Sequence, residues 1–248
     1  MSPSIEKEFF IEDTETTVRY ADLNSNVVAV VTHPWTFLGG NMHNNVVVAA
    51  VLYFQKLGIS TVRFDFHGSG IGRGYTQVEQ VRSIVRKIVK RDFDDNGDDD
   101  DKQEDTATHP AKRPTKVILI GYSYGSLITG SASANMDECI ASISIAPPFA
   151  VQHWLLLFNS SYHLRQSTLA EHLPRLFLMG TKDNFTSEKV FQNMIETHYL
   201  SAVGAIVPHA DHFFHRREKD VMDVIGQWLL ETFASHCQGD LRRLRDFP

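Results

Sequence analysis

The chain contains the stretch Val117-Ile118-Leu119-Ile120-Gly121-Tyr122-Ser123-Tyr124-Gly125-Ser126, which decides the fold. Its four consecutive aliphatic residues predict a strand that is buried on both faces, as in a parallel sheet. A Gly-x-Ser-x-Gly pattern follows, and residues 126–135 are small or apolar and lack proline, which predicts a helix. A strand, a tight turn and a helix, with serine at the apex, form the setting in which this pattern makes a nucleophile elbow.

The two glycines of the pattern have a steric purpose in such an elbow. The apex serine adopts a strained backbone conformation that holds its hydroxyl clear of the sheet. Strand and helix then approach closely two residues on either side, at Gly121 and Gly125, where only a small residue fits. The alternative is an ordinary glycine turn with Ser123 as an exposed hydroxyl. Partners elsewhere in the chain decide between the two.

Outside this stretch, strands and helices alternate along the chain. A leading antiparallel hairpin is expected at 8–23, and further strands at 27–32, 61–66, 140–146, 175–179 and 202–207. Helices are expected at 42–56, 77–91, 151–172, 187–198 and 216–233. This order predicts an α/β fold, a mostly parallel central sheet with helices on both faces and no large cap domain. In such sheets, ligands bind at the carboxyl ends of the strands.

The length of 248 residues and the hydrophobic content of 42% suit one large domain. We assign residues 1–235 to that domain and residues 236–248 to a polar C-terminal tail, which we expect to be frayed. An acidic insert interrupts the domain at 92–115. Its first part, 92–105, carries nine acids and one lysine, so it contributes −8 to a total of −6 and leaves +2 for the rest. Such a block of like charge predicts a disordered loop.

Composition argues against several kinds of partner and compartment. No run approaches the ~18 apolar residues of a transmembrane helix, so we expect no membrane partner. The near-neutral body offers no clustered basic face for a nucleic acid. The N-terminus does not resemble a secretory signal, and two cysteines, Cys139 and Cys237, give no disulfide framework. A cytoplasmic location is therefore expected.

A serine hydroxyl becomes a nucleophile when a histidine takes its proton and a carboxylate orients that histidine. In an elbow-bearing sheet, the acid and then the histidine follow the serine along the chain. Asp183 comes just after the strand expected at 175–179, and His212 comes just after the strand expected at 202–207. The predicted catalytic triad is therefore Ser123, Asp183 and His212.

Other roles for these side chains are alternatives. Asp183 could cap the turn before the next helix, and His209 could replace His212 as the base. Asp211 adjoins His212 and is expected to point away from it. His209, His212 and His215 are also spaced like metal ligands, but no glutamate or cysteine accompanies them, so no metal is expected.

The oxyanion that forms during acyl transfer needs two preorganised donors. The backbone N–H of Tyr124, directly after the serine, is one candidate. The second is expected in the loop after the strand at 27–32, where Pro34 has no N–H and Trp35 is the next residue. We therefore assign the oxyanion hole to the backbone N–H groups of Tyr124 and Trp35.

A substrate pocket is expected between the strands that end at 146 and begin at 175. This segment has room for one or two helices but not for a cap domain. It contains the apolar cluster Trp154-Leu155-Leu156-Leu157-Phe158, part of which we expect to line an acyl or alcohol pocket, and we assign Trp154, Leu157 and Phe158 to the wall of that pocket. The alternative is that this apolar cluster packs on the sheet.

Two further motifs resemble ligand-binding loops. The glycines of residues 68–74 do not follow the G-x-G-x-x-G spacing and no P-loop lysine follows, so we interpret this segment as a flexible loop beside the site. Residues 92–98 match the first half of a calcium-binding loop, but Gln103 stands where a bidentate glutamate is needed. Weak calcium binding there is an alternative, and no cofactor is expected.

Taken together, these motifs resemble those of the α/β-hydrolases over nearly the whole chain, and in particular a group of small lidless serine hydrolases. That group carries a His-Pro loop ending in Gly-Gly, here residues 33–40, and an Arg-Phe-Asn-Phe-Arg-Gly stretch, here Arg-Phe-Asp-Phe-His-Gly at 63–68. Residues 121–125 and 210–214 are also similar to that group. The resemblance implies a serine triad at the three residues named above and no cofactor, while the acidic insert is foreign to the group.

The sequence thus predicts a serine hydrolase that cleaves a small to medium carboxylic ester or thioester through an acyl-enzyme, with a small-molecule ester as its partner. One alternative is a peptidase or amidase that uses the same triad. Another is a non-catalytic scaffold that recruits a basic partner through the acidic insert. The residues leave the oligomeric state undecided.

Overall fold

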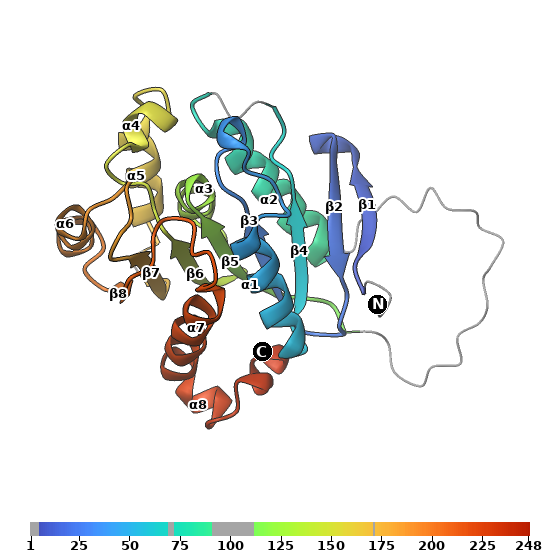
Figure 1. The fold of residues 1–248 in the computed structure, drawn as a ribbon. Helices are drawn as coiled ribbons and strands as arrows, with labels where there is room; N and C mark the ends of the chain where they lie inside the picture. Colours follow the sequence, from blue (N-terminus) through green and yellow to red (C-terminus); the bar gives the residue numbers. More distant parts are fainter. Residues whose placement is uncertain (1–4, 69–71, 91–111, 171) are drawn as a thin grey trace, which may run out of the picture.

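A computed structural model describes residues 5–68, 72–90, 112–170 and 172–248 (Figure 1). The expected acidic segment 92–105, its calcium-loop motif and part of the glycine-rich loop lie outside the described residues. An eight-stranded sheet forms the centre, in the order β1-β2-β4-β3-β5-β6-β7-β8. The strands are β1 (Lys7–Ile11), β2 (Thr16–Ala21), β3 (Val27–Thr32), β4 (Ser60–Phe64), β5 (Lys116–Tyr122), β6 (Cys139–Ile145), β7 (Arg175–Gly180) and β8 (Val203–Val207). β1 and β2 are antiparallel, and the pairs from β4 to β8 are parallel.

Helices cover both faces of the sheet (Figure 1). Their bounds are α1 (Asn45–Lys56), α2 (Tyr75–Lys90), α3 (Tyr124–Ala132), α4 (Gln152–Leu155), α5 (Ser160–Thr168), α6 (Glu188–His198), α7 (Glu218–Thr232) and α8 (Ala234–Cys237). Short 3₁₀ turns are η1 (Glu12–Thr14), η2 (Thr36–Leu38) and η3 (Leu241–Asp246). One apolar cluster joins the sheet to α1, α7 and α8, and the other joins it to α2, α3 and α6. The expected α/β architecture is confirmed.

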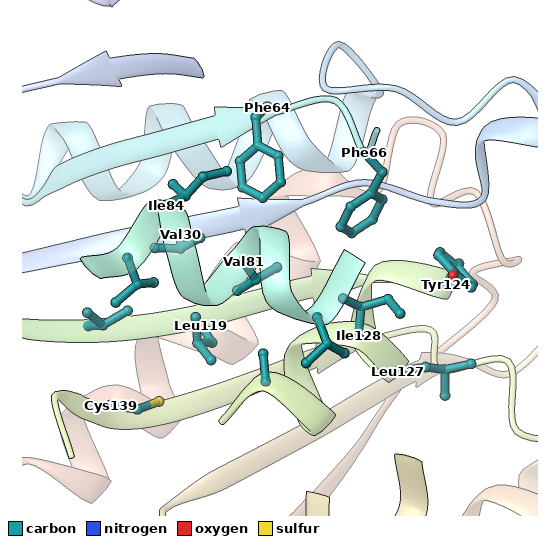
Figure 2. Close-up of a cluster of buried hydrophobic side chains, with 14 of the residues drawn as sticks. Val30, Phe64, Phe66, Val81, Ile84, Leu119, Tyr124, Leu127, Ile128 and Cys139 are labelled. Atoms are coloured by element: carbon teal, nitrogen blue, oxygen red, sulfur yellow. The ribbon is translucent and has the colours of Figure 1, made fainter. Parts of the chain in front are cut away.

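The central strands are continuously apolar because each of their faces meets a helical layer. Along β3, Val28 and Val30 belong to one apolar cluster, whereas Val27, Ala29 and Val31 belong to the other. Figure 2 shows the first cluster, in which Val81 and Ile84 of α2 lie over the sheet near Val30 and Leu119. The pairing of β3 with β5 aligns Thr32 with Gly121, so both strands end at the same edge of the sheet. That edge is where the polar loops of the chain collect.

Two predicted helices differ from the structure in their bounds. The helix expected from residue 42 begins at Asn45, because a turn closed by hydrogen bonds between Asn41 and Asn44 precedes it. The helix expected over 151–172 is two helices, α4 and α5. Leu157 and Phe158 separate them, with φ angles of 43° and 64° that no right-handed helix can contain.

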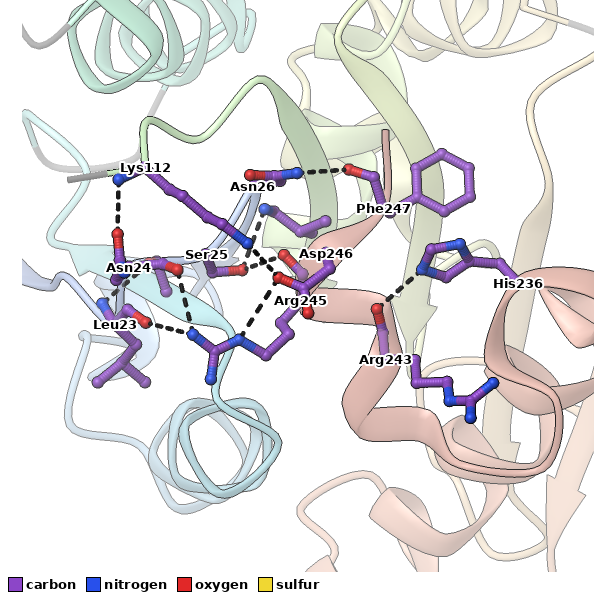
Figure 3. Close-up of polar contacts among 12 residues, drawn as sticks. Leu23, Asn24, Ser25, Asn26, Lys112, His236, Arg243, Arg245, Asp246 and Phe247 are labelled. Atoms are coloured by element: carbon purple, nitrogen blue, oxygen red, sulfur yellow. Dashed lines mark hydrogen bonds and ion pairs between the residues drawn. The ribbon is translucent and has the colours of Figure 1, made fainter. Parts of the chain in front are cut away.

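The prediction that the C-terminal tail is frayed is wrong, because the tail is folded onto the amino ends of the central strands (Figure 3). Leu241 and Leu244, one 3₁₀ turn apart, are both buried in the cluster beside α7. The carbonyl of Arg245 accepts hydrogen bonds from the Asn26 amide at 2.8 Å and the Ser25 hydroxyl at 2.9 Å. Residues 236–248 therefore belong to the folded domain and cover the edge of the sheet at which the parallel strands begin.

Of the helices in the described part of the chain, none is long and apolar enough to cross a lipid bilayer.

Candidate active site

Ser123 stands at a strained turn between β5 and α3. Its φ of 53° and ψ of −120° are unfavourable for a residue with a Cβ, and the surrounding hydrogen bonds hold it there. Its amide donates to the carbonyl of Ile145 on the neighbouring strand at 2.8 Å, and its own carbonyl accepts from the amide and hydroxyl of Ser126. Residues 121–125 therefore have the strand–turn–helix geometry that is expected of a nucleophile elbow.

The glycines beside the elbow lie where no side chain fits. A Cβ on Gly121 would overlap the Cα of Ser126 and the carbonyl of Gly125, and a Cβ on Gly125 would press on Thr32 and the carbonyl of His33. At Gly121, strand β5 thus touches helix α3, as the spacing of the pattern predicts, whereas at Gly125 the start of α3 touches the end of the neighbouring strand β3. The Thr129 hydroxyl also obstructs a Cβ on Gly121, but because the other two obstructing atoms are backbone atoms, rotating a side chain cannot relieve the overlap.

We expect Gly121→Ala to lower the free energy of unfolding by about 3 kcal/mol or more, or to prevent recovery of soluble protein, because the overpacking cannot relax. Urea unfolding followed by circular dichroism measures this. Gly72→Ala is the matched control, since a Cβ there meets no heavy atom within 4 Å. Equal stability of the two variants would contradict the close contact of strand and helix.

The structure brings Ser123, His212 and Asp183 together in one hydrogen-bonded chain. The Nε2 atom of His212 lies 2.9 Å from the Oγ of Ser123, and its Nδ1 lies 2.8 Å from the Oδ2 of Asp183. The Asp183 side chain is fully buried, and its other oxygen accepts the amides of Phe185 and Thr186 at 2.7 and 3.1 Å. Asp183 therefore both caps a turn and faces the imidazole, so the two roles proposed from the sequence coexist.

The loops that carry the acid and the histidine are tied to each other. The amide of Lys182 donates to the carbonyl of Ala210 at 2.8 Å, and the amide of His209 donates to the hydroxyl of Thr181 at 2.8 Å. The ring of Phe185 lies 4.4 Å from the imidazole of His212, measured between centroids. These contacts fix the separation between Asp183 and His212.

Neighbours of His212 have other roles. Asp211 points away from the imidazole, as expected, and its Oδ1 accepts the amides of Phe213 and Phe214 at 2.9 and 3.0 Å. His209 and His215 are exposed. In the described part of the chain, no three His, Cys, Asp or Glu side chains are grouped as metal ligands.

Tyr122 is a positioning residue that the sequence did not reveal. Its hydroxyl donates to the backbone carbonyl of His212 at 3.0 Å. Burial, with contributions from Asp183 and Asp211, raises the pKa of the Tyr122 phenol well above its ordinary value, so the group stays protonated and remains a donor. The residue just before Ser123 thus anchors the loop that carries His212, a contact that local sequence patterns cannot indicate.

His33 organises the loop that was assigned to the oxyanion hole. The amide of Phe66 donates to its Nε2 at 2.8 Å, so Nε2 is unprotonated and Nδ1 carries the proton that goes to the carbonyl of Pro34 at 2.6 Å. Burial lowers the pKa of His33 and favours this neutral form. The loop then closes where the amide of Gly40 donates to the carbonyl of Trp35 at 3.0 Å.

A second buried histidine, His163, has its Nε2 2.6 Å from the carbonyl of Arg73, and burial lowers its pKa. Both folded-state pKa values thus lie below the ordinary 6.5. Below pH 6.5 the unfolded chain takes up protons that the folded chain does not, so the free energy of unfolding should fall as pH falls. Each histidine contributes up to about 1.4 kcal/mol per pH unit in that window.

The free energy of unfolding of wild type is measured by urea unfolding at several values between pH 7 and pH 5. We expect this free energy to depend less steeply on pH in His163→Gln. His209→Gln, at an exposed position, is the control and should keep the wild-type slope. A wild-type stability that rises on acidification over this range would contradict the neutral, buried state of the two rings.

A cavity of about 280 Å³ opens beside Ser123. Its walls are mostly apolar, and the described residues that line it are Pro34, Trp35, Leu38, Gly40, Asn44, Tyr122, Ser123, Pro148, Leu155, Phe185, His212 and Phe213. The prediction for Trp154, Leu157 and Phe158 is wrong, because all three are exposed and outside this lining. Leu155 of the same apolar segment lines the cavity, and its neighbour Leu156 is fully buried, whereas Trp154 is exposed. Trp35 does lie at the wall, and Tyr124 begins α3 directly behind the serine.

The eight-stranded sheet, its helical layers and the elbow define the α/β-hydrolase fold without a lid. Solved structures with this fold include an alpha-beta serine hydrolase homologue from Coxiella burnetii, at 20% identity, 91% coverage of this chain, 96% coverage of that chain and a TM-score of 0.67. A lidless serine hydrolase from Xanthomonas campestris is 22% identical, with 93% of this chain and 95% of that chain covered and a TM-score of 0.68. The Pyrococcus furiosus esterase Pf2001 is 14% identical, with 91% of this chain and 91% of that chain covered and a TM-score of 0.66.

An uncharacterized protein of Rickettsia prowazekii is 23% identical to this chain over 226 residues, which cover 88% of this chain and 85% of that protein. No protein-family model matches the chain. At these identities the comparisons establish the fold only, so the chemical activity is argued from the geometry of the site.

Proposed function

We propose that this protein is a serine hydrolase that cleaves a small to medium carboxylic ester or thioester through an acyl-enzyme. The observation that carries the proposal is the hydrogen-bonded chain from Ser123 through His212 to Asp183 at a strained elbow. A serine at such a turn, a base within reach and an acid that orients the base meet the geometric criteria for nucleophilic catalysis.

In the proposed mechanism, the Oγ of Ser123 attacks the ester carbonyl while the Nε2 of His212 takes the hydroxyl proton. The carboxylate of Asp183 stabilises the imidazolium that forms. The histidine then gives the proton to the departing alcohol or thiol, which leaves Ser123 acylated. Water repeats the sequence on the acyl-enzyme, with His212 as the base, and releases the acid.

The negative charge that develops on the carbonyl oxygen needs donors already in place. The backbone N–H of Tyr124 belongs to the first turn of α3, whose amides have no acceptor within the helix. We assign the second donor to the backbone N–H of Trp35, which lies at the cavity wall in the loop ordered by His33. The neutral His33 ring would hold that loop without adding a charge to the site.

The cavity favours an uncharged, apolar substrate. His212 and Tyr122 carry the ionisable rings among its described lining residues, and none of those residues has a carboxylate, ammonium or guanidinium group that could bind a peptide terminus. A peptidase or amidase is therefore the weaker proposal. Serine hydrolases and esterases among the solved structures with this fold support a hydrolase, and the two free, buried cysteines support a cytoplasmic setting.

A fluorophosphonate probe tests the proposal, because it reacts only with an activated serine. We expect stoichiometric labelling of folded wild type, with the added mass on the peptide that contains Ser123, and none after heat unfolding. Parallel assays with p-nitrophenyl esters, a thioester and an anilide of one acyl group should rank the ester and thioester above the anilide. Folded protein that takes no label would point to the non-catalytic scaffold instead.

A further inference from the structure

Large apolar side chains are exposed together around the loops that carry the active site. We call them the apolar rim, and they are Phe37, Leu38, Trp154, Leu157, Phe158 and Phe213. The exposed fraction is 63% for Phe37 and 70% for Trp154. Leu38 and Phe213 also line the cavity, and Trp154 directly precedes the lining residue Leu155, which places the rim beside the cavity mouth. Several large exposed apolar side chains beside one cavity indicate a binding face.

The rim is presented by an ordered turn. After α4, the amide of Phe158 donates to the carbonyl of His153 at 2.6 Å, and the hydroxyl of Ser160 lies 2.6 Å from the Nδ1 of His153. Leu157 and Phe158 have positive φ angles, an unfavourable state for bulky side chains. The rings of Trp154 and Phe158 lie 5.0 Å apart, edge to face. Strained backbone that turns apolar side chains toward water indicates a function for those side chains.

The exposed charged side chains within the rim loops themselves are basic, and an exposed carboxylate that contacts these loops is that of Asp65, which accepts the amide of Met42. The loops involved are 34–45, 147–159, 181–187 and 208–217, and their only acids are Asp183 and Asp211. Asp183 is buried against His212, and the carboxylate of Asp211 accepts two backbone amides. Lys182 and Arg216 are exposed. A partner with negative charge and an apolar interior complements this face.

We propose that the apolar rim binds the surface of an anionic phospholipid bilayer, so that the active site takes an ester of an amphiphile directly from the lipid. The substrate part of this proposal rests on the proposed function. A protein seated on the rim would cover the mouth through which a substrate enters, whereas a bilayer supplies the substrate through that mouth. The sequence predicts no membrane partner because no segment spans a bilayer, but side chains that insert into the interface need no spanning segment.

Vesicle binding tests the proposal without catalysis. Full-length Ser123→Ala protein is mixed with vesicles of phosphatidylcholine and phosphatidylglycerol at 3:1, and the bound fraction is measured by flotation. We expect the added Trp154→Ser and Phe158→Ser changes to lower the partition coefficient by about 10-fold or more. Adding Leu169→Ser and Leu200→Ser instead is the matched control, since these exposed leucines lie outside the rim, and it should leave partition unchanged. Vesicles of phosphatidylcholine alone should bind several-fold more weakly.

Tryptophan emission gives a second readout. The chain has three tryptophans, and the difference between wild type and Trp154→Phe isolates the exposed one. This difference spectrum should shift to shorter wavelength when anionic vesicles are added. Circular dichroism melting confirms that each variant is folded.

Folded protein that does not float with anionic vesicles would overturn the proposal, as would an equal loss in the control variant. Concentration-dependent dimers that disappear in the rim variant would assign the face to a second copy of the chain and also overturn it. Vesicle binding without fluorophosphonate labelling of wild type would remove the proposed function and keep the lipid surface. Labelling without vesicle binding would do the reverse.

Discussion

Alanine at Ser123 is expected to lower the kcat of ester hydrolysis by about 10⁶-fold, because the acyl-enzyme can no longer form. His212→Ala should cost about as much, and the double variant little more than either, since the two side chains act as one unit. The KM should change far less than kcat, because the cavity walls are intact. Initial rates on a p-nitrophenyl ester measure the effect, with the acyl group chosen as the one that wild type hydrolyses fastest.

Ser126→Ala is the matched control for this prediction. The Ser126 hydroxyl is also buried beside the elbow, but it donates to the carbonyl of Ser123 at 2.6 Å and does not meet the imidazole. We expect it to lose less than about 10-fold in kcat, the cost of one neutral hydrogen bond. Comparable losses in the two variants would mean that the elbow geometry, and not the Ser123 hydroxyl, sustains the activity.

The elbow could be predicted from ten residues because its causes are local. The atoms that require glycine at 121 belong to residues 125, 126 and 129, and the buried strand directly precedes the serine. The acid and the histidine could be predicted because each follows directly on a strand, and parallel strands end at one edge of the sheet. Position after a strand end is therefore enough to bring Asp183 and His212 to Ser123.

The cavity wall could not be predicted, because it depends on the phase of one short helix. With only four residues in α4, no periodicity distinguishes Leu155 from Trp154. The helix is also followed by positive φ at Leu157 and Phe158, a conformation usually signalled by glycine, and neither residue is glycine. Strain of this kind leaves no mark on the sequence.

The folded tail and the two positioning residues were missed for a different reason. Leu244 is buried, and the neighbouring Arg245 carbonyl binds Ser25 and Asn26, which stand about 220 positions earlier in the chain. His33 likewise acts through the amide of Phe66, and Tyr122 through the carbonyl of His212. In each case the partner is a backbone group, which every residue type carries. Sequence patterns contain no information on such pairs.

Asparagine at Asp183 tests the assignment of the acid most sharply. The Oδ1 of Asp183 accepts the amides of Phe185 and Thr186, so an asparagine would keep its carbonyl oxygen there and turn its NH₂ group toward the Nδ1 of His212. An N–H donor facing Nδ1 forces the imidazole proton onto Nε2, which then cannot take the proton of Ser123. We expect kcat to fall by about 10⁴-fold with little change in stability.

Asp211→Asn separates this tautomer effect from a general loss of negative charge near the histidine. Asp211 adjoins His212, but its Oδ1 accepts only the amides of Phe213 and Phe214, and an asparagine oxygen can accept both. This variant should therefore keep kcat within about 5-fold of wild type, the difference between a charged and a neutral acceptor. Equal losses in the two variants would mean that field strength rather than tautomer selection governs the base. A larger loss at Asp211 would move the acid of the triad to that residue, because only a side chain that selects the Nδ1–H form leaves Nε2 free to accept the serine proton.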